Sequence, residues 1–439
     1  MANTFLTRTS SSTGNRKTWT LSAWVKRSFT GTKHGIFGTY TDGNNRLDMA
    51  FDANDKITMK EKVSSSTNID FTTTAKFRDT NAWYHIVFKV DTTQATEADR
   101  VKVYVNGTEI TVWTDSTYPS QNYDTLMNVS GRSYLVGQTG GGSNYWDGCM
   151  AHVHLTDGNA YTASTFGSTD STTGIWEPTT GPSVTYGTNG FFLKFGNAAS
   201  LGTDSSGQSN NFTKSGNGLQ TKDNPNNNMA VINFAIPTVS QNCTVTNGGT
   251  TINSTSSAHR NTPASVALAL GNGKFYWEMK VETMSTHVKT GVGFTEWSKY
   301  TYLNQGEEFS ASNEGYAYRN DGQKENNGAS SYGNSYTVND IIGVAFDTEN
   351  RKLFFAKNGT WQNSGDPAAG SNPAFTVAAD FVYYPVVNLY EAKVSYNFGA
   401  GFFGNSAVAS EGTNASNVGK FEYDVPTGFT AVTTKGLNL

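Results

Sequence analysis

The sequence predicts an all-β protein built as two tandem antiparallel β-sandwiches. Only 15% of its 439 residues are charged, whereas an average soluble protein has about 25%. The 45 glycines, with abundant Ser, Thr and Asn, disfavour long helices and suit strands joined by many turns. Aromatic residues make up 13% of the chain, which is enough to fill hydrophobic cores. Because one core rarely grows beyond about 250 residues, the length indicates two domains.

The first domain, predicted over residues 1–195, consists of successive strands. Residues 19–26 alternate apolar and polar side chains with the period of two that a half-buried strand needs. Asn106-Gly107 separates two strand-like runs and predicts a hairpin, because both residues tolerate the positive φ of a type I′ turn. Other strands are expected at residues 46–51, 56–60, 83–90, 100–105, 134–137 and 149–155.

A second domain is predicted over residues 231–400, after a polar linker at residues 196–230. Residues 275–282 alternate again, and Asn358-Gly359 predicts a second hairpin of the same chemistry. Residues 401–439 are rich in Gly and Asn and are expected to form a C-terminal extension, with residues 420–429 docked on the surface.

Charge and hydropathy argue against two classes of partner. The net charge of −4 and the lack of a Lys/Arg cluster disfavour nucleic acid. No apolar run approaches the roughly 20 residues that a membrane span needs, and the first 20 residues do not read as a signal peptide. Cys149 and Cys243 are interpreted as buried strand residues, with a bridge between the two domains as the alternative.

The second half carries a specific run of motifs. GKFYWEMKV, GVGF, GYAYRNDGQKENNG, DIIGVAFDTENRKLFFAKNGTW and YYPVV follow one another over residues 270–399. In content and order this run resembles a SPRY domain. The resemblance implies a bent antiparallel β-sandwich that binds partners through its loops and has no catalytic activity of its own.

The first half resembles a laminin-G or concanavalin-like jelly-roll sandwich, on the segments TWTLSAWVKRS, WYHIVFKVD, VKVYVNGTEI and YWDGCMAHVHLTDG. Across most of the chain, LTDGNAYTASTFGSTDSTTGIWEP, YGTNGFFLKFGNAASLGTDSSGQSNNFT and the closing VPTGF are similar to tail-fibre-like virion proteins of marine tailed phages of the cyanophage type. That similarity implies a structural or adhesive component of the virion.

Catalytic acids are not evident. Concanavalin-like glucanases carry a strand such as Glu-x-Asp-x-x-Glu, which places its carboxylates on one face of a cleft, and no such strand occurs here. Glu278 and Glu282 come nearest, and we interpret them as a solvated outer face of a strand. Glu307 and Glu308 fall in a predicted loop. The protein is therefore expected not to be an enzyme.

Two metal sites are conceivable from residue types. His152 and His154 flank one residue of a predicted strand and could bind zinc if a third ligand converged, or could belong to a polar outer face. Calcium, the one cofactor considered, could be bound by Asp42, Asn44 and Asp147, although turn formation explains these residues equally well.

Aromatic residues near predicted loops are the candidates for recognition, because their faces stack on sugar rings while polar neighbours fix hydroxyls. The predicted ligand-binding residues are Tyr145 and Trp146 in the first domain, and Trp297, Tyr300, Tyr316, Arg319, Asp321 and Tyr332 in the second. The family resemblance favours the second group. Core packing or oligomer contacts are the alternative for the aromatic members.

The function expected is that of a non-enzymatic virion protein, a tail-fibre-like adhesin that binds a host-surface glycan or protein through its sandwich loops. A purely structural decoration protein of capsid or tail is the alternative, since no fibre-building repeat or coiled-coil shaft is seen. A polysaccharide depolymerase is disfavoured. Expected partners are other virion proteins, the host ligand and further copies of the chain. The expected location is the virion surface, on a tail fibre or the capsid exterior, after synthesis in the host cytoplasm.

Overall fold

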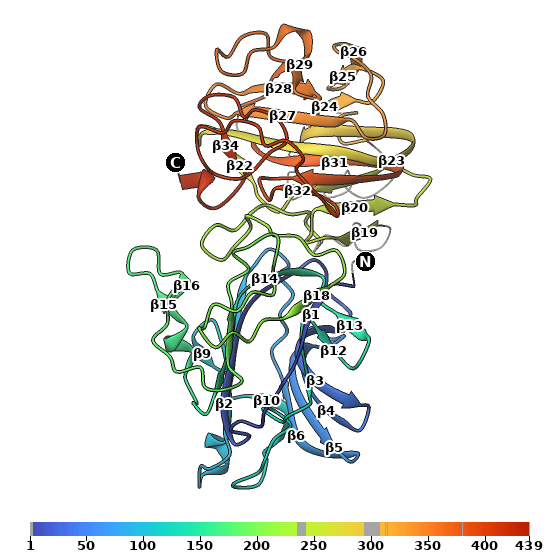
Figure 1. Cartoon of the computed structure of the whole chain (residues 1–439). Helices are drawn as coiled ribbons and strands as arrows, with labels where there is room; N and C mark the ends of the chain where they lie inside the picture. The colour runs from blue at the N-terminus through green and yellow to red at the C-terminus, as the bar shows by residue number, and fades with distance from the viewer. Residues whose placement is uncertain are drawn as a thin grey trace. The chain divides into compact units, whose positions relative to one another are not determined.

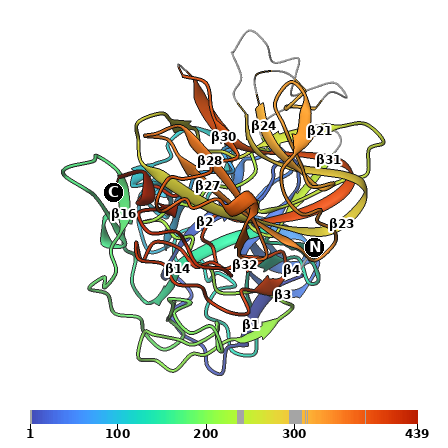
Figure 2. The same cartoon turned by 90° about the horizontal axis from the view of Figure 1, so that it is seen from above.

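The computed structural model describes residues 3–234, 243–293, 308–311, 313, 315–379 and 381–438, to which all structural statements refer. The chain divides into two compact units, residues 1–220 with 224–226 and residues 221–223 with 227–439. Strands dominate both units (Figures 1 and 2). Helical structure in the described ranges is confined to three-residue 3-10 turns, η1 (Glu97–Asp99), η2 (Ala163–Thr165), η4 (Gln362–Ser364) and η5 (Gly436–Asn438). The predicted all-β class is therefore confirmed.

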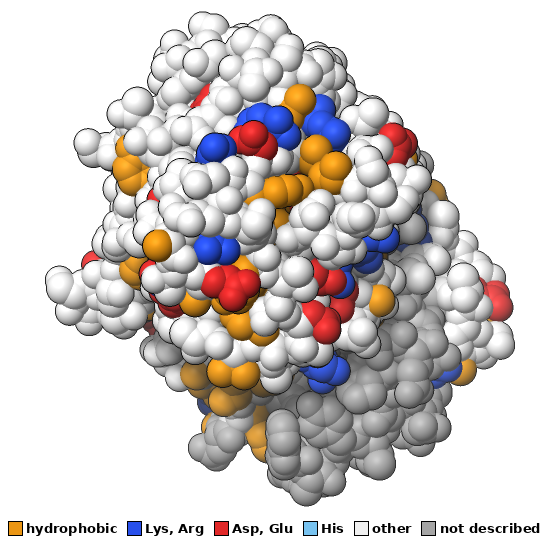
Figure 3. Space-filling model, turned by 90° about the horizontal axis from the view of Figure 1, so that it is seen from below, with side chains coloured by type: hydrophobic (Ala, Val, Ile, Leu, Met, Phe, Trp, Pro, Cys, Tyr) orange, Lys and Arg blue, Asp and Glu red, His pale blue; other side chains and the backbone are white. Residues whose placement is uncertain are grey.

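The low charge of the sequence is visible on the surface. Figure 3 shows one face of the molecule, on which charged side chains are sparse among uncharged side chains and backbone. Of the helices in the described ranges, none has the length and apolar character needed to cross a membrane.

The first unit encloses its core between two antiparallel sheets. Their strand orders are β10-β6-β5-β4-β3-β11-β1-β18 and β17-β14-β2-β7-β8-β9. The first sheet comprises β1 (Phe5–Thr9), β3 (His34–Asp42), β4 (Asn45–Phe51), β5 (Ile57–Val63), β6 (Ser66–Thr73), β10 (Trp113–Thr117), β11 (Ser133–Val136) and β18 (Thr213–Ser215). The second comprises β2 (Thr18–Arg27), β7 (Tyr84–Asp91), β8 (Val101–Val105), β9 (Thr108–Glu109), β14 (Gly148–Asp157) and β17 (Phe191–Leu193). Two short ribbons pair β12 (Gln138–Thr139) with β13 (Ser143–Tyr145) and β15 (Gly167–Thr169) with β16 (Trp176–Pro178).

The Asn106-Gly107 hairpin is confirmed between β8 and β9. The two residues have φ angles of 47° and 83°, as a type I′ turn requires. Asn106 also accepts a hydrogen bond from the backbone N–H of His85 at 2.8 Å through Oδ1. A Cβ atom on Gly107 would lie 2.7 Å from the ring of Trp176, so this turn needs glycine for space as well as for conformation.

A bulge in β14 changes the phase of its alternation. His152 adopts a φ of 47°, and the register with β2 shifts around it. Val153 and Leu155 face the core between the sheets, whereas Cys149 and Ala151 pack in a separate cluster on the other side. Cys149 and Ala151 lie on the opposite side from Val153 and Leu155, because one extra residue in a strand reverses the side on which the preceding residues lie.

The second unit is organised around two long strands that run side by side, β23 (Lys274–Gly293) and β31 (Val382–Asn397) (Figure 2). The first part of β23 also pairs with β27 (Ile341–Asp347), and its last part pairs with β24 (Gly315–Arg319). The other strands are β19 (Cys243–Thr246), β20 (Thr251–Ser254), β21 (Arg260–Pro263), β22 (Leu268–Ala269), β25 (Gln323–Glu325), β26 (Ala329–Ser331), β28 (Lys352–Lys357), β29 (Thr360–Trp361), β30 (Phe375–Thr376), β32 (Phe402–Phe403), β33 (Ser406–Ala407) and β34 (Thr430–Ala431).

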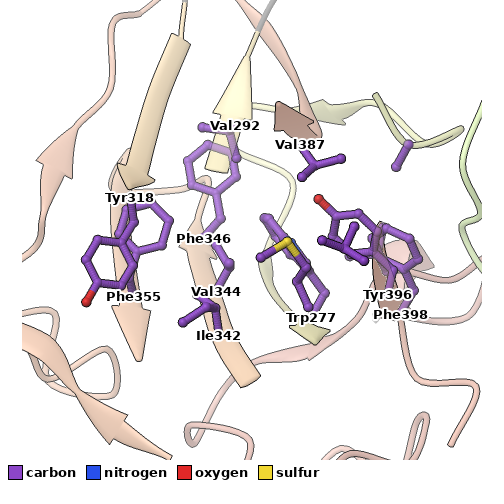
Figure 4. Packing of buried hydrophobic residues seen from close by; sticks show 14 of the residues in the cluster. Trp277, Val292, Tyr318, Ile342, Val344, Phe346, Phe355, Val387, Tyr396 and Phe398 are labelled. Atoms are coloured by element: carbon purple, nitrogen blue, oxygen red, sulfur yellow. The ribbon is translucent and has the colours of Figure 1, made fainter. Parts of the chain in front are cut away.

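Aromatic side chains dominate the core of the second unit. Trp277 of β23, Phe346 of β27 and Phe355 of β28 are fully buried and lie in one cluster (Figure 4). The Asn358-Gly359 hairpin joins β28 to β29 with φ angles of 48° and 79°, which confirms the second predicted hairpin. The apolar side of the alternating strand β23, which carries Trp277, faces this aromatic core cluster.

The C-terminal segment belongs to the sheet and core of the second unit. β34 pairs with β23 in parallel, and Phe421, Val425 and Phe429 pack against Tyr276. This segment covers Glu278 of β23, whose side chain is 0% exposed. The expectation that Glu278 lies on a solvated outer face is therefore wrong, because residues more than 140 positions later in the chain close over that face.

Glu278 fastens the C-terminal segment to β23. Its carboxylate accepts hydrogen bonds from the backbone N–H groups of Glu422 at 3.0 Å and Tyr423 at 2.9 Å. The Tyr276 hydroxyl and the Asn397 amide each donate to it at 3.1 Å. Burial nevertheless raises the pKa of Glu278 to about 7, because removal from water disfavours the charged form more than these bonds favour it.

Candidate binding face of the second unit

Five strands of the second unit bring polar side chains to one face of the sheet. Asn261 of β21, Asn388 of β31, Lys289 of β23 and Arg319 of β24 stand opposite one another in successive ladders. Glu325 of β25 lies on the same face, because its ladder partner is two residues before Arg319. Directly opposed residues point to the same side of a sheet, so the strand register alone creates this polar row of five residues.

Ion pairs hold the polar row together. The Lys289 Nζ is buried, lies 2.6 Å from Glu325 Oε2 and also contacts the carboxylate of Glu308. Arg319 Nη1 lies 3.2 Å from Glu325 Oε1. Burial by itself would raise the pKa of Glu325, but hydrogen bonds from Lys289 and Ser310 outweigh burial and lower it. Buried charges are tolerated when they are paired in this way, so the polar row forms a fixed base.

Residues 308–310 lie over the polar row. The backbone N–H of Phe309 donates to Asn261 Oδ1 at 3.1 Å, and Ser310 Oγ donates to Glu325 Oε2 at 2.6 Å. The ring of Phe309 is buried against Ala317 of β24. Glu308, which the sequence left in a loop without a partner, is thus part of an ordered network, while Glu307 lies outside the described residues.

Three rings, those of His259, His287 and Tyr390, form a cluster beside the polar row. Their centroids are 5.4 Å (His259–Tyr390), 5.7 Å (His259–His287) and 6.2 Å (His287–Tyr390) apart. His259 is fixed on both sides, since Nδ1 lies 2.8 Å from Asn388 Oδ1 and Nε2 lies 3.2 Å from Glu308 Oε1. All three side chains are partly exposed. We call them the ring cluster.

Two predicted ligand-binding residues lie on this face. Arg319 Nη2 is 2.8 Å from Asp321 Oδ2, and the two side chains are 20% and 43% exposed. Burial opposes the charge on Arg319, but Asp321 and Glu325 outweigh it and raise the pKa of the guanidinium. Trp297 and Tyr300 lie outside the described residues.

The other two predicted residues of this unit lie on the opposite side of the sheet. Tyr316 of β24 is 6% exposed and belongs to the core. Tyr332 packs against the same core, with its ring 5.4 Å from that of Tyr318. The expectation that Tyr316 and Tyr332 share a loop surface with Arg319 is therefore wrong, because an odd sequence separation along β24 places Tyr316 and Arg319 on opposite faces.

Of the two aromatic residues predicted to bind a ligand in the first unit, only one is accessible at the surface. Tyr145, at the end of β13, is partly exposed and its ring lies 5.9 Å from that of Phe5. Trp146 is 5% exposed and packs in the core, with its ring 6.0 Å from that of Phe51. Trp146 cannot stack on a ligand from there, so this part of the prediction is wrong.

The predicted calcium ligands do not converge. Asp42, at the end of β3, accepts a hydrogen bond from the backbone N–H of Asn44 at 2.7 Å, and this bond lowers its pKa. Asp147 follows Trp146, whose ring contacts His34 at the start of β3. β3 runs for eight residue steps from His34 to Asp42, a length of about 26 Å. Asp147 therefore lies near one end of this strand and Asp42 at the other. Nowhere in the described ranges do three or more His, Cys, Asp or Glu side chains form a group that could hold a metal ion.

His154 is buried and His152 half-buried, and no third ligand joins them among the described residues. The two rings lie 6.4 Å apart and both contact the ring of Phe192. His154 Nδ1 is 2.9 Å from the Tyr186 hydroxyl. Burial lowers the pKa of both imidazoles, so they act as neutral packing groups on a covered sheet face. Cys149 and Cys243 are likewise buried and form no disulfide.

Sequence reasoning missed most of the binding face. His259, His287, Lys289, Glu325 and Tyr390 were not singled out. A weak signal existed at Lys289, which follows Val288 by one residue and precedes Val292 by three, so an alternating strand places its charge on the face opposite the two valines. The partners of that charge come from strands far away in sequence, and no local pattern specifies them.

Comparisons with known proteins assign a domain to each half. Residues 3–165 match the family model Laminin_G_3, described as the concanavalin A-like lectin/glucanases superfamily, and residues 274–401 match the SPRY domain model. The chain therefore contains a concanavalin A-like domain and a SPRY domain, in agreement with the two resemblances seen in the sequence.

Three solved structures are similar to parts of the chain. The SPRY domain of human HERC1 is 22% identical, with 35% of this chain and 91% of that chain covered and a TM-score of 0.29. A human SPRY domain is 16% identical, with 36% and 94% covered and a TM-score of 0.28. The native heptameric SAP-like pentraxin from Limulus polyphemus is 16% identical, with 36% and 71% covered and a TM-score of 0.27.

Proposed function

We propose, proceeding from the concanavalin A-like domain at residues 3–165 and the SPRY domain at residues 274–401, that this protein is a non-enzymatic binding protein. It attaches to a host-surface glycan or protein through the polar row and ring cluster of its second unit. One observation carries the proposal: a paired ion network with Lys289 buried at its centre lies on one sheet face beside three partly exposed rings and the Arg319–Asp321 pair. Such pre-organisation lowers the cost of ordering side chains when a ligand binds.

The proposal that the protein belongs to a virion comes from the sequence. The segments that resemble virion proteins of marine tailed phages span both halves of the chain. We propose a tail-fibre-like adhesin on the surface of such a virion, which works by avidity. Many copies on one particle can raise the overall affinity by a factor of about 10² or more without any single tight site.

The binding function is tested with purified full-length protein on cyanobacterial cells. We expect saturable binding that Arg319→Gln weakens about fivefold, since this change removes the exposed ion pair with Asp321 and one partner of Glu325. Arg78→Gln is the matched control, because the Arg78 side chain is 62% exposed and lies in the first unit. Equal binding by wild type and Arg319→Gln would count against this face as the binding surface.

The virion part of the proposal needs a separate experiment. Immunogold labelling of intact particles should place the protein on the tail or its fibres. Labelling of the capsid, together with no cell binding at micromolar concentration, would replace the adhesin by the decoration protein that the sequence left as an alternative. Release of reducing sugar from host polysaccharide would overturn the non-enzymatic assignment.

A further inference from the structure

The ring cluster contains polar atoms that no described residue satisfies. Neither the hydroxyl of Tyr390 nor a ring nitrogen of His287 has a hydrogen-bond partner in the described part of the chain, although both side chains touch other rings. His259 differs, because Asn388 and Glu308 occupy both of its nitrogens. The cluster therefore combines one fixed ring with two rings whose polar atoms are open to solvent.

The two open rings are held in place by the strands that carry them. His287 and Tyr390 are directly opposed in the β23–β31 ladder, two residues before Lys289 and two after Asn388. Their neighbours Val288 and Leu389 are fully buried in the core. A ligand therefore meets aromatic faces and hydrogen-bonding atoms whose backbone positions are already set.

Charge at this face disfavours an ionic ligand. Each cation that the described residues bring to the polar row is paired, Lys289 with Glu308 and Glu325, and Arg319 with Glu325 and Asp321. Among these described residues three carboxylates outnumber two cations, so they would repel an anionic ligand and offer it no free cation. A bound metal cation would need several converging carboxylates, and the described residues contain no group that could hold one.

Aromatic rings with open donors and acceptors, beside described charges that are all paired, match one ligand chemistry. A sugar ring presents apolar C–H groups that stack on aromatic faces and hydroxyls that both donate and accept. We infer that His287 and Tyr390 form a subsite for a neutral sugar residue, with His259 as the fixed ring behind them. This inference rests on the proposed function of the same face and specifies its ligand class.

Saturation-transfer NMR on the full-length protein tests the subsite. The probes are the methyl glycosides of glucose, galactose and mannose, and methyl glucuronide as the anionic counterpart. We expect transfer to at least one neutral glycoside and none to the glucuronide. Tyr390→Ala and His287→Ala should each weaken binding about tenfold, the loss expected for truncating a central aromatic contact. Tyr390→Phe keeps the ring and should lose less.

Tyr423→Ala is the matched control, because Tyr423 is also a partly exposed tyrosine of the second unit but lies beside the cluster of Ile341, Phe403 and Val408. Circular dichroism and Tm of each variant establish that it is folded, and Tyr390→Phe keeps the test valid if Tyr390→Ala is not. Stronger binding of the glucuronide, unchanged binding by His287→Ala and Tyr390→Phe, or loss of binding only in Tyr423→Ala would each overturn the inference.

The outcomes also separate this inference from the proposed function. If Arg319→Gln weakens cell binding but no neutral glycoside shows transfer, the face binds a ligand of another class and only the sugar subsite is refuted. If cells are not bound at all while a glycoside shows transfer that Tyr390→Ala abolishes, the subsite stands and the adhesin role fails.

Discussion

Replacing Glu278 by Gln should change how the stability of the second unit depends on pH. The Glu278 carboxyl is fully buried, and burial raises its pKa from 4.5 to about 7. The folded chain therefore holds this proton more tightly than the unfolded chain does. The resulting stabilisation is fully present below pH 4.5 and is lost as the pH rises through about 7.

The size of the effect follows from that difference in pKa. A rise from 4.5 to about 7 corresponds to about 3 kcal/mol, since one pKa unit represents about 1.4 kcal/mol. In a unit of about 200 residues each kcal/mol shifts Tm by roughly 2–4 °C, so this group should lower Tm by roughly 6–12 °C at pH 8. Glu278→Gln removes the titrating group, but its amide nitrogen cannot accept the bonds that one carboxylate oxygen accepts. The variant should therefore be less stable than wild type near pH 4.5, and this difference should shrink by about 3 kcal/mol as the pH rises to 8.

Unfolding of the full-length protein by heat and by guanidinium, followed from pH 4.5 to 8, measures this difference. Glu349→Gln makes the same chemical change at an exposed turn residue and is the matched control. The difference between wild type and variant removes the contribution of other titrating groups. A difference between wild type and Glu278→Gln that stays constant from pH 4.5 to 8 would refute the reasoning, because Glu278 would then not release a tightly held proton in this range.

Three further predictions concern the packing that supports the site and the first unit. Lys289→Met leaves Glu308 and Glu325 without their buried cation and should lower the free energy of unfolding by about 3–5 kcal/mol; a loss below 1 kcal/mol in guanidinium titrations would contradict the ion network. Gly107→Ala meets the Trp176 ring and should cost about 1–3 kcal/mol more than Gly31→Ala, which has almost the same φ but open space around it; equal losses would show that conformation alone matters. Burial lowers the pKa of His85 to about 3, so His85 should make the first unit less stable as the pH drops below about 6.5, by at most about 1.4 kcal/mol per pH unit. His85→Gln should reduce the slope by that amount while His152 and His154 keep their share, and an unchanged slope would show that His85 does not contribute to it.

Much of the fold could be predicted from local patterns. The alternation over residues 19–26 and 275–282 indicated strands, and both Asn-Gly pairs form the expected hairpins with positive φ. The motif order identified both domains that the family comparisons then found. These features depend on neighbours within a few residues, so the sequence reports them directly.

The candidate site could be predicted only in part. Arg319 and Asp321 lie on the candidate binding face, whereas Tyr316 and Trp146 were assigned to ligand binding although both are buried. Aromatic side chains serve cores and binding surfaces alike, and a sequence gives no measure of exposure. An alternating strand shows that two faces differ without showing which face another segment will cover.

The sequence by itself determined the strands, the two hairpins and the domain type of each half, because backbone preference and alternation are local properties. Only the tertiary structure decided that Asn261, Lys289, Arg319 and Asn388 form one row, and that the C-terminal segment closes over Glu278. Strand register, and the packing of one segment over another, bring together residues that lie tens to more than a hundred positions apart in the sequence. Their energies depend on burial and charge pairing, which arise only when those segments meet.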